Sequence, residues 1–237
     1  MKNIDIVVPI YNEGERIINF LKNCEKNLDI NSRFLICYDR EDDISLPFLK
    51  NIKDSRSPIT LIKNPSRGPC TAVIEGIKNC NADIIMTIPA DENLEYDILK
   101  KMIDHINDGN DLVIPSRFIK GGKMIGAPWL KKLIAYIGSL LISNFALIPI
   151  KDATNCFKMF RKSMIENINL TSKVGFLYAF EIAVKSYLQN YKIIEIPYTW
   201  KMETKKKSNF KTLEWLPSYI NFLFFSFTQN LKKKFLK

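Results

Sequence analysis

The sequence predicts an α/β fold built on a mainly parallel sheet. Short apolar runs rich in isoleucine and valine alternate with helical patterns along the first half of the chain, and polar clusters follow the ends of those runs. Alternation of this kind joins parallel strands through right-handed crossovers and places helices on both faces of the sheet. A chain of 237 residues, 46% of them hydrophobic, can bury one substantial core.

Five strands are predicted from apolar runs that end at turn-forming residues, and four helical patterns lie between them. The predicted strands cover residues 4–10, 34–38, 59–62, 84–88 and 112–115. The predicted helices cover residues 15–27, 46–54, 68–79 and 95–108. No repeat or low-complexity linker interrupts the pattern, so we expect one α/β domain over residues 1–212.

The chain changes character after residue 120. Residues 129–150 form a long apolar stretch broken by Ser139, Ser143 and Asn144, and a transmembrane helix needs about 20 predominantly apolar residues. We predict an interfacial helix over about 131–148. A helix buried in the core and a helix that spans the membrane are the alternatives.

Residues 213–237 are predicted to form an aromatic and basic C-terminal tail, with an amphipathic helix that begins near Pro217. Its aromatic side chains are followed by Lys232, Lys233 and Lys234. Aromatic rings next to lysines are typical of helices at an anionic membrane surface, where each lysine contributes on the order of 1 kcal/mol. Packing of the rings on the protein core is the alternative.

The net charge of +10 narrows the classes of partner. Positive charge suits nucleic acid, an anionic membrane surface or phosphorylated substrates. The sequence argues against nucleic acid, because it has no zinc-ligand spacing, RNP-like sequence or basic heptad segment. The five cysteines are scattered and odd in number, and no signal peptide is visible, which predicts reduced thiols in a cytosolic protein.

Polar clusters follow the predicted strands, at the edge where α/β sheets bind ligands. They cover residues 9–13, 38–43, 89–93, 115–122 and 152–158. Carboxylates from several strand ends repel one another unless a cation or a donor-rich ligand lies between them. We therefore expect these clusters to share one ligand.

The residue types in the clusters indicate a phosphorylated ligand held together with a metal ion. Asp91 and Asn93 carry the oxygen ligands that Mg²⁺ or Mn²⁺ takes alongside substrate phosphates. Asp39 is suited to accept hydrogen bonds from a base or a ribose hydroxyl. The cationic side chains available for phosphate oxygens are Arg117, Lys120, Lys123 and Lys158.

Six segments in order resemble the family 2 glycosyltransferases, in the bacterial branch that is similar to dolichyl-phosphate mannose synthases. The resemblance covers residues 4 to about 222. It rests on residues 8–13, 38–42, 89–91, 116–122, 152–158 and 195–200. It implies a GT-A (Rossmann-like) fold, a nucleotide-sugar donor, a divalent cation and inverting transfer.

The resemblance also implies roles for individual residues. The residues that match nucleotide-sugar-binding positions are Pro9, Tyr11, Glu13, Asp39 and Asp91. Asp91 and Asn93 match the metal-binding segment, and Arg117 matches a residue that faces the donor and acceptor phosphates. The residues that we assign to the acceptor phosphate are Arg117, Lys120, Lys158 and Ser208.

The sequence departs from the family pattern in two segments. The usual Asp-x-Asp reads Pro89-Ala90-Asp91, so one carboxylate is missing. A later segment, Arg-x-x-Gly-x-Ser-Lys/Arg in the family, has Glu203 and Asn209 at its basic positions, with lysines at 205–207 between them. These lysines are the positive charge left for an acceptor phosphate in that segment.

We expect inverting transfer of a sugar from a nucleotide-sugar donor to a polyprenyl phosphate, by a cytoplasmic enzyme that is peripheral on the inner face of the cell membrane. The predicted catalytic residues are Asp91, Arg117 and Glu181. Glu181 would position the acceptor or act as the base that a hydroxyl acceptor needs, and a buried structural pair with a lysine is the alternative. Transfer to a sugar hydroxyl in polysaccharide or glycolipid synthesis, and a non-catalytic nucleotide-sugar-binding protein, are the alternatives. A homo-oligomer or a membrane-embedded partner stays open.

Overall fold

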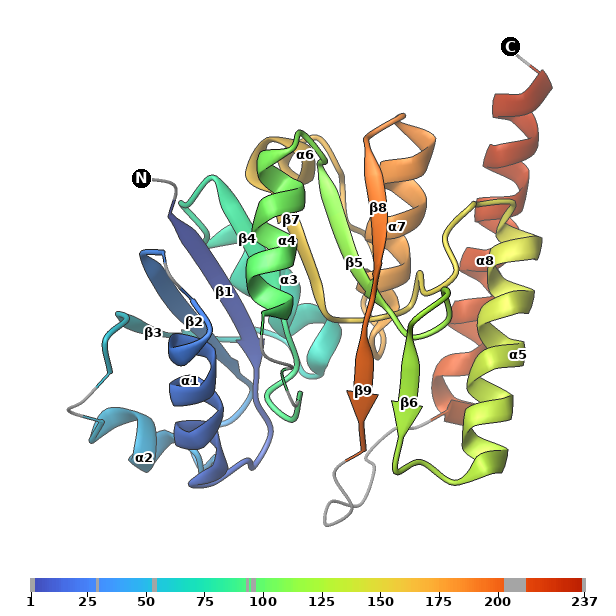
Figure 1. The fold of residues 1–237 in the computed structure, drawn as a ribbon. Coiled ribbons are helices and arrows are strands. Elements are labelled where there is room, and N and C mark those ends of the chain that lie inside the picture. Colours follow the sequence, from blue (N-terminus) through green and yellow to red (C-terminus); the bar gives the residue numbers. More distant parts are fainter. Residues whose placement is uncertain are drawn as a thin grey trace.

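A computed structural model describes residues 3–28, 30–52, 55–92, 94, 97–202 and 212–235. Figure 1 shows a twisted central sheet with helices in front of it and behind it, and two long helices beside it. The predicted α/β architecture is confirmed.

The main sheet has seven strands in the order β3-β2-β1-β4-β7-β5-β8. All of them run parallel except β7, which is antiparallel to both of its neighbours. In chain order the strands are β1 (Ile4–Pro9), β2 (Ser32–Tyr38), β3 (Ile59–Lys63), β4 (Ile84–Thr87), β5 (Leu112–Ser116), β7 (Lys158–Arg161) and β8 (Ile193–Pro197). A second, two-stranded parallel sheet pairs β6 (Lys123–Ile125) with β9 (Thr199–Lys201).

The core lies on both faces of the main sheet, because successive side chains of a strand point to opposite faces. Ile6 and Val8 of β1 pack with α1 (Arg16–Lys26), α2 (Leu46–Lys50) and α4 (Ile98–Asn107). Val7 lies on the other face, which is covered by α3 (Pro69–Lys78), α6 (Lys162–Glu166) and α7 (Leu177–Leu188). Runs that are apolar at every position are therefore buried on both sides.

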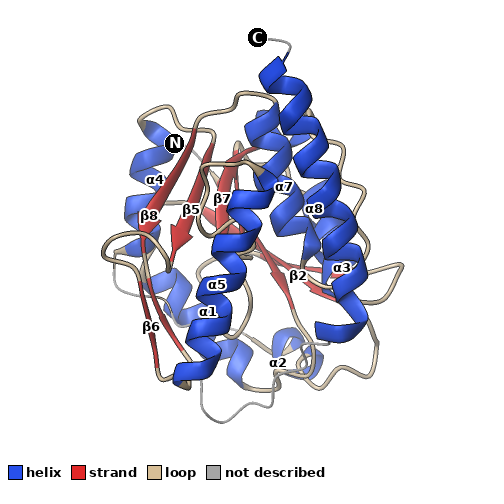
Figure 2. Ribbon diagram, turned by 90° about the vertical axis from the view of Figure 1, so that its right-hand side faces the viewer, coloured by secondary structure: helices blue, strands red, loops and turns tan. Residues whose placement is uncertain are grey.

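Two long helices, α5 (Trp129–Ala146) and α8 (Thr212–Phe235), pack side by side beyond the edge of the sheet (Figures 1 and 2). Helix α8 also packs on α7, through the rings of Phe222 and Phe180 at 5.2 Å between centroids. Ser226 and Asn230 of α8 donate hydrogen bonds to the Ala146 carbonyl at the end of α5. Within the ranges given above, no helix combines the length and the apolar character needed to cross a bilayer.

The five predicted strands and four predicted helices are all present, with ends shifted by a few residues. Strand β7 was not expected as a separate strand. The start of the last helix was predicted wrongly, because Pro217 lies inside α8 and not at its beginning. Packing explains the longer helix: Trp215, before the proline, stacks edge-on against Phe176 with centroids 5.8 Å apart.

The five cysteines are free thiols, as predicted, and four of them are fully buried. Burial raises the pKa of Cys37, Cys70 and Cys156 to about 12. Thiols with raised pKa values carry little thiolate at neutral pH and react slowly. The four buried thiols therefore act as small apolar side chains of the core.

Asp5 joins three segments at the sheet edge where β1 begins. Its carboxylate accepts two hydrogen bonds from Arg33, at 2.9 and 2.7 Å, and two from the backbone amides of Asn81 and Ala82, at 2.6 and 3.0 Å. Burial alone would raise the pKa of Asp5, but these bonds hold it below its ordinary value of 3.8. The ionised form is thus the one that stabilises the fold.

Replacing Asp5 by asparagine is expected to lower the free energy of unfolding by about 3 kcal/mol, because Arg33 is left beside a buried neutral group. A group with a lowered pKa stabilises above its unfolded pKa and loses this effect as the pH falls. The deficit of Asp5→Asn should therefore be full at pH 7 and shrink below pH 3.8. Urea unfolding at several pH values measures both. Asp42→Asn, in the exposed pair with Arg40, is the control and should cost under about 0.5 kcal/mol.

Candidate active site

Four strands bring several of the predicted site residues to one edge of the sheet. β1, β2, β4 and β5 run in the same direction, so their carboxyl ends lie along the same edge, with neighbouring strands about 4.8 Å apart. Pro9 is the last residue of β1, and Glu13 follows it. Asp39, Asp91 and Arg117 follow β2, β4 and β5. The structure therefore brings together residues that lie far apart in the sequence.

The turn after β1 is fixed by the segment that precedes α2. The Asp43 carboxylate accepts a hydrogen bond from the Asn12 amide at 2.9 Å, and the Ser45 hydroxyl accepts one from the Glu13 amide at 2.9 Å. Asn12 has a φ of 54°, a left-handed conformation that asparagine tolerates better than most residues. The turn leaves the Tyr11 side chain half exposed at the edge of the sheet.

Asp39 holds the loop between β3 and α3. Its two carboxylate oxygens accept hydrogen bonds from the Asn64 side-chain amide at 2.6 Å and from the Gly68 backbone amide at 2.8 Å. Gly68 has a φ of 106°, which a residue with a side chain rarely adopts. Each carboxylate oxygen has a further lone pair, so Asp39 can still accept a hydrogen bond from a ligand.

The segment 64–71, which was not predicted as part of the site, lies against Asp39. Asn64 also bonds Thr71, at 3.0 Å, and exposed Arg67 lies between them. A signal was present in the sequence: Gly68 followed by Pro69, a few residues after a strand, is typical of a turn into the first residue of a helix. This segment adds a cation and a helix N-terminus to the same edge.

Asp91 and Glu92 lie in the turn after β4 and have opposite surroundings. Asp91 is exposed, whereas Glu92 is buried and accepts a hydrogen bond from the Tyr198 hydroxyl. Burial raises the pKa of Glu92 to about 7, although the bond from Tyr198 opposes the shift. Of these two neighbours, Asp91 is therefore the one that offers its carboxylate to a ligand at the surface.

The residues at this turn fit a divalent cation that is held jointly with a substrate. The described part of the chain contains no group of three or more His, Cys, Asp or Glu side chains that would hold a metal ion. Mg²⁺ and Mn²⁺ are commonly bound by one or two carboxylates together with substrate phosphates, and exposed Asp91 supplies one carboxylate. Asn93, the second predicted ligand, lies outside the described residues.

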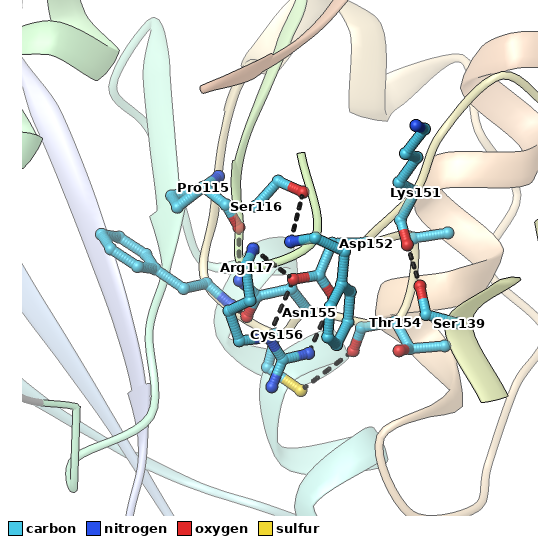
Figure 3. Close-up of polar contacts among 12 residues, drawn as sticks. Pro115, Ser116, Arg117, Ser139, Lys151, Asp152, Thr154, Asn155 and Cys156 are labelled. Atoms are coloured by element: carbon cyan, nitrogen blue, oxygen red, sulfur yellow. Dashed lines mark hydrogen bonds and ion pairs between the residues drawn. The ribbon is translucent and has the colours of Figure 1, made fainter. Parts of the chain in front are cut away.

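Arg117 is held by Asp152 in a bidentate ion pair (Figure 3). Its Nε and Nη2 donate to the two carboxylate oxygens at 2.8 and 2.7 Å, and its backbone amide donates to the same group at 2.9 Å. The Asp152 side chain is fully buried, and the Arg117 side chain is 19% exposed. Burial alone would lower the pKa of Arg117, but Asp152 holds it above its ordinary value. The site therefore contains a permanent positive charge in a fixed orientation.

The turn that carries Asp152 is itself fixed from two directions. Glu195 of β8 accepts hydrogen bonds from the backbone amides of Lys151 and Asp152, both at 2.8 Å. Ser139 of α5 donates to the Lys151 carbonyl (Figure 3). Asn155 donates to the last carbonyl before Ser116, that of Pro115, at 2.6 Å. Arg117 is thus oriented by contacts from β5, β8 and α5.

Lys158 was predicted to bind the acceptor phosphate, and the structure places it elsewhere. Its side chain is fully buried, and its amine donates to the Ala153 carbonyl at 3.1 Å. Burial lowers the pKa of Lys158 to about 8, although Asp152 opposes the shift. Lys158 therefore stabilises the 152–158 turn from the protein interior. Its burial favours this structural role over the predicted contact with a phosphate. Lys120 is exposed in the loop after β5, where a phosphate can reach it.

Glu181 was predicted to be catalytic, and its contacts favour a structural role instead. The side chain is fully buried in α7 and accepts hydrogen bonds from the Thr171 amide and hydroxyl at 2.8 Å, from the Ser172 amide at 2.9 Å and from Lys185 at 2.6 Å. Burial would raise the pKa of Glu181, but these donors hold it below its ordinary value. A carboxylate in this state is a poor base. Ser208, the last predicted residue, lies outside the described residues.

Comparison with known proteins identifies the family. The family model described as "Glycosyl transferase family 2" matches residues 5–168. Among curated proteins, a dolichol-phosphate mannosyltransferase of Pyrococcus furiosus is 28% identical over 88% of this chain and 59% of its own length. A dolichyl-phosphate hexose transferase of Haloferax volcanii is 24% identical over 82% of this chain and 81% of its own length. This chain thus spans little more than half the length of the Pyrococcus protein.

Solved structures with the same fold include glucosyl-3-phosphoglycerate synthase from Mycobacterium tuberculosis. Its complex with Mn²⁺, UDP and glucosyl-3-phosphoglycerate superimposes with a TM-score of 0.66 at 11% identity, over 95% of this chain and 78% of that chain. Its complex with Mg²⁺ and UDP gives a TM-score of 0.62 at 14% identity, over 91% and 74%. The shared topology confirms the predicted GT-A (Rossmann-like) fold. From the match over residues 5–168, this chain belongs to glycosyl transferase family 2.

Proposed function

We propose that the protein is an inverting glycosyltransferase that moves a sugar from a nucleotide-sugar donor to a polyprenyl phosphate at the inner face of the cell membrane. The observation that carries the proposal is the placement of exposed Asp91 and of Arg117, held by Asp152, at one edge of the sheet. A metal ligand and a fixed cation at one edge suit a diphosphate leaving group. The names of the Pyrococcus and Haloferax relatives support a lipid-phosphate acceptor.

The donor side is assigned to residues after β1, β2 and β4. We assign Tyr11, Glu13 and Asp39 to the nucleotide and Asp91, with Asn93, to a divalent cation. Such a cation, when bound, neutralises charge on the donor diphosphate. Arg67 is added to this side because it is exposed next to the loop that Asp39 holds.

The proposed reaction is a displacement at the anomeric carbon of the donor sugar. An acceptor phosphate oxygen forms the new bond to that carbon while the bond to the diphosphate breaks, and the nucleoside diphosphate leaves with the electron pair. Arg117 stabilises the negative charge on the leaving group and also attracts the acceptor phosphate, together with Lys120. A phosphate acceptor is already anionic, so no general base is required, in agreement with the structural contacts of Glu181.

An exposed apolar surface on α5 and α8 supports a location at the membrane. Both helices expose large apolar side chains at helical spacing, and contiguous patches of this kind mark interaction sites. We name these residues the apolar face: Trp129, Leu130, Leu133, Ile134, Tyr136, Ile137, Leu140, Leu141 and Phe145 of α5, and Leu216, Ile220, Phe224 and Phe225 of α8. With a net charge of +10, the chain is suited to an anionic lipid surface.

The double variant Ile134→Asp/Phe224→Asp is expected to bind anionic vesicles at least about tenfold more weakly, because apolar burial contributes roughly 25 cal/mol per Å². Both side chains are more than half exposed, so the fold should be unaffected. Co-sedimentation with phosphatidylglycerol vesicles measures binding. Ile44→Asp, also more than half exposed but outside the apolar face, is the control. Equal binding of the double variant and the control would remove the apolar face from the proposal.

The activity itself is tested with a panel of GDP- and UDP-sugars, Mn²⁺ or Mg²⁺, and undecaprenyl phosphate. The expected product is a lipid-extractable phosphosugar that releases its sugar in mild acid. A glycoside formed on an added oligosaccharide, with no lipid product, would instead establish transfer to a sugar hydroxyl. Absence of cation-dependent nucleotide binding across the panel would contradict the proposal altogether.

A further inference from the structure

The turn after β4 contains two consecutive carboxylates that the fold treats differently. Asp91 is exposed, and Glu92 is directed into the protein, where its residue is 9% exposed. The backbone amide of Glu92 donates to the Pro89 carbonyl at 3.1 Å, which closes the turn. Because the two residues are adjacent, an anchor on Glu92 restrains the backbone that carries the Asp91 side chain.

That anchor is Tyr198, 106 residues away in the sequence. Its hydroxyl donates to the Glu92 carboxylate, and its fully buried ring packs edge-on against Phe157 with centroids 5.7 Å apart. The hydroxyl is therefore presented from a side chain with little freedom to move. Loss of the hydroxyl alone would free Glu92 without creating a cavity.

The backbone of Tyr198 connects the same anchor to the arginine side of the site. Its amide donates to the Ser116 carbonyl at 3.0 Å, directly before Arg117. Its carbonyl accepts from the Lys123 amide at 3.0 Å, at the start of the small β6–β9 sheet. Tyr198 thus contacts the Asp91 turn through its side chain and the Arg117 strand through its main chain.

We propose that Glu92 and Tyr198 are positioning residues that hold the Asp91 turn in register with Arg117. This inference rests on the proposed function, since it assigns Asp91 to a cation. It also assigns a role to Glu92 in this turn, where Pro89 replaces the first aspartate of the family's Asp-x-Asp pattern. Neither residue touches the reacting atoms: both act through Asp91.

The test measures binding of GDP and of UDP in the presence of Mn²⁺, by titration calorimetry, together with thermal unfolding. Tyr198→Phe and Glu92→Leu are expected to raise the dissociation constant of the Mn²⁺–nucleotide complex about tenfold, because displacement of a ligand by about 1 Å is costly. Glu92→Gln keeps an oxygen that accepts from Tyr198 and should stay within about twofold of the wild type. The double variant Tyr198→Phe/Glu92→Leu should lose no more than either single variant.

Tyr191→Phe is the matched control, because Tyr191 is partly buried in the turn before β8, at the opposite end of that strand from Tyr198. It should bind as the wild type does. If Tyr198→Phe had a lowered melting temperature but the same dissociation constant as the wild type, the positioning role would be overturned. The proposed function would be left intact. Failure of the wild type to bind either nucleotide with Mn²⁺ would overturn both.

Discussion

Lysine in place of Arg117 is expected to lower kcat/KM for sugar transfer about 10²–10³-fold, the loss that follows removal of one oriented donor from a developing anion. The bidentate contact with Asp152 requires the planar guanidinium, because two of its nitrogens donate to two carboxylate oxygens. A lysine amine keeps the charge but cannot reproduce that fork. Initial rates with the preferred donor and undecaprenyl phosphate measure the loss, and thermal unfolding checks the fold.

A second pair on the same sheet supplies the control for Arg117. Arg161 and Asp111 form a partly exposed ion pair at 3.7 Å, at the opposite edge from the site. Arg161→Lys should transfer sugar within about twofold of the wild-type rate, since the pair lies at the opposite edge of the sheet from the site. A wild-type rate in Arg117→Lys would show that the orientation of the guanidinium does not matter, and the assignment of Arg117 to the phosphates would be wrong.

Asp91→Ala is expected to reduce transfer about 10³-fold and to abolish saturation by Mn²⁺, because the cation supplies several kcal/mol of charge stabilisation. Asp91 is exposed in the turn after β4, and the neighbouring carboxylate of Glu92 accepts a hydrogen bond from Tyr198. Rates measured against Mn²⁺ concentration separate loss of the metal from loss of the fold.

Asp104→Ala, an exposed substitution on α4, is the control for Asp91 and should leave both the rate and the Mn²⁺ dependence unchanged. If Asp91→Ala kept the wild-type rate and the same response to Mn²⁺, the cation would have to be held by other groups. The proposal for the donor side would then need a different centre.

The strands and helices could be predicted because their signals are local. An apolar run such as Ile4–Pro9 is bounded by turn residues, and parallel pairing then brings Glu13, Asp39, Asp91 and Arg117 to one edge without any knowledge of side-chain contacts. The antiparallel strand β7 was missed because it has only four residues, and so short a run carries no signal for the direction in which it pairs with its neighbours.

The roles of Lys158 and Glu181 could not be read from residue type. A lysine within a polar cluster is expected to bind phosphate. The structure shows instead that the Lys158 amine donates a hydrogen bond to the Ala153 carbonyl inside the core. Glu181 looks like a base until Thr171, Ser172 and Lys185 are seen to surround it. Partners of this kind come from tertiary packing between distant segments, which periodicity does not encode.

Helix α5 has an inner side as well as an outer one. On the inner side, Ser139 bonds the carbonyl of Lys151, and the next residue, Asp152, grips Arg117. Ser139 is thus linked to the Arg117 guanidinium by one hydrogen bond and by the peptide unit that joins Lys151 to Asp152. If the apolar face lies on a bilayer, as proposed, a detergent that displaces α5 should slow sugar transfer even when the donor is saturating.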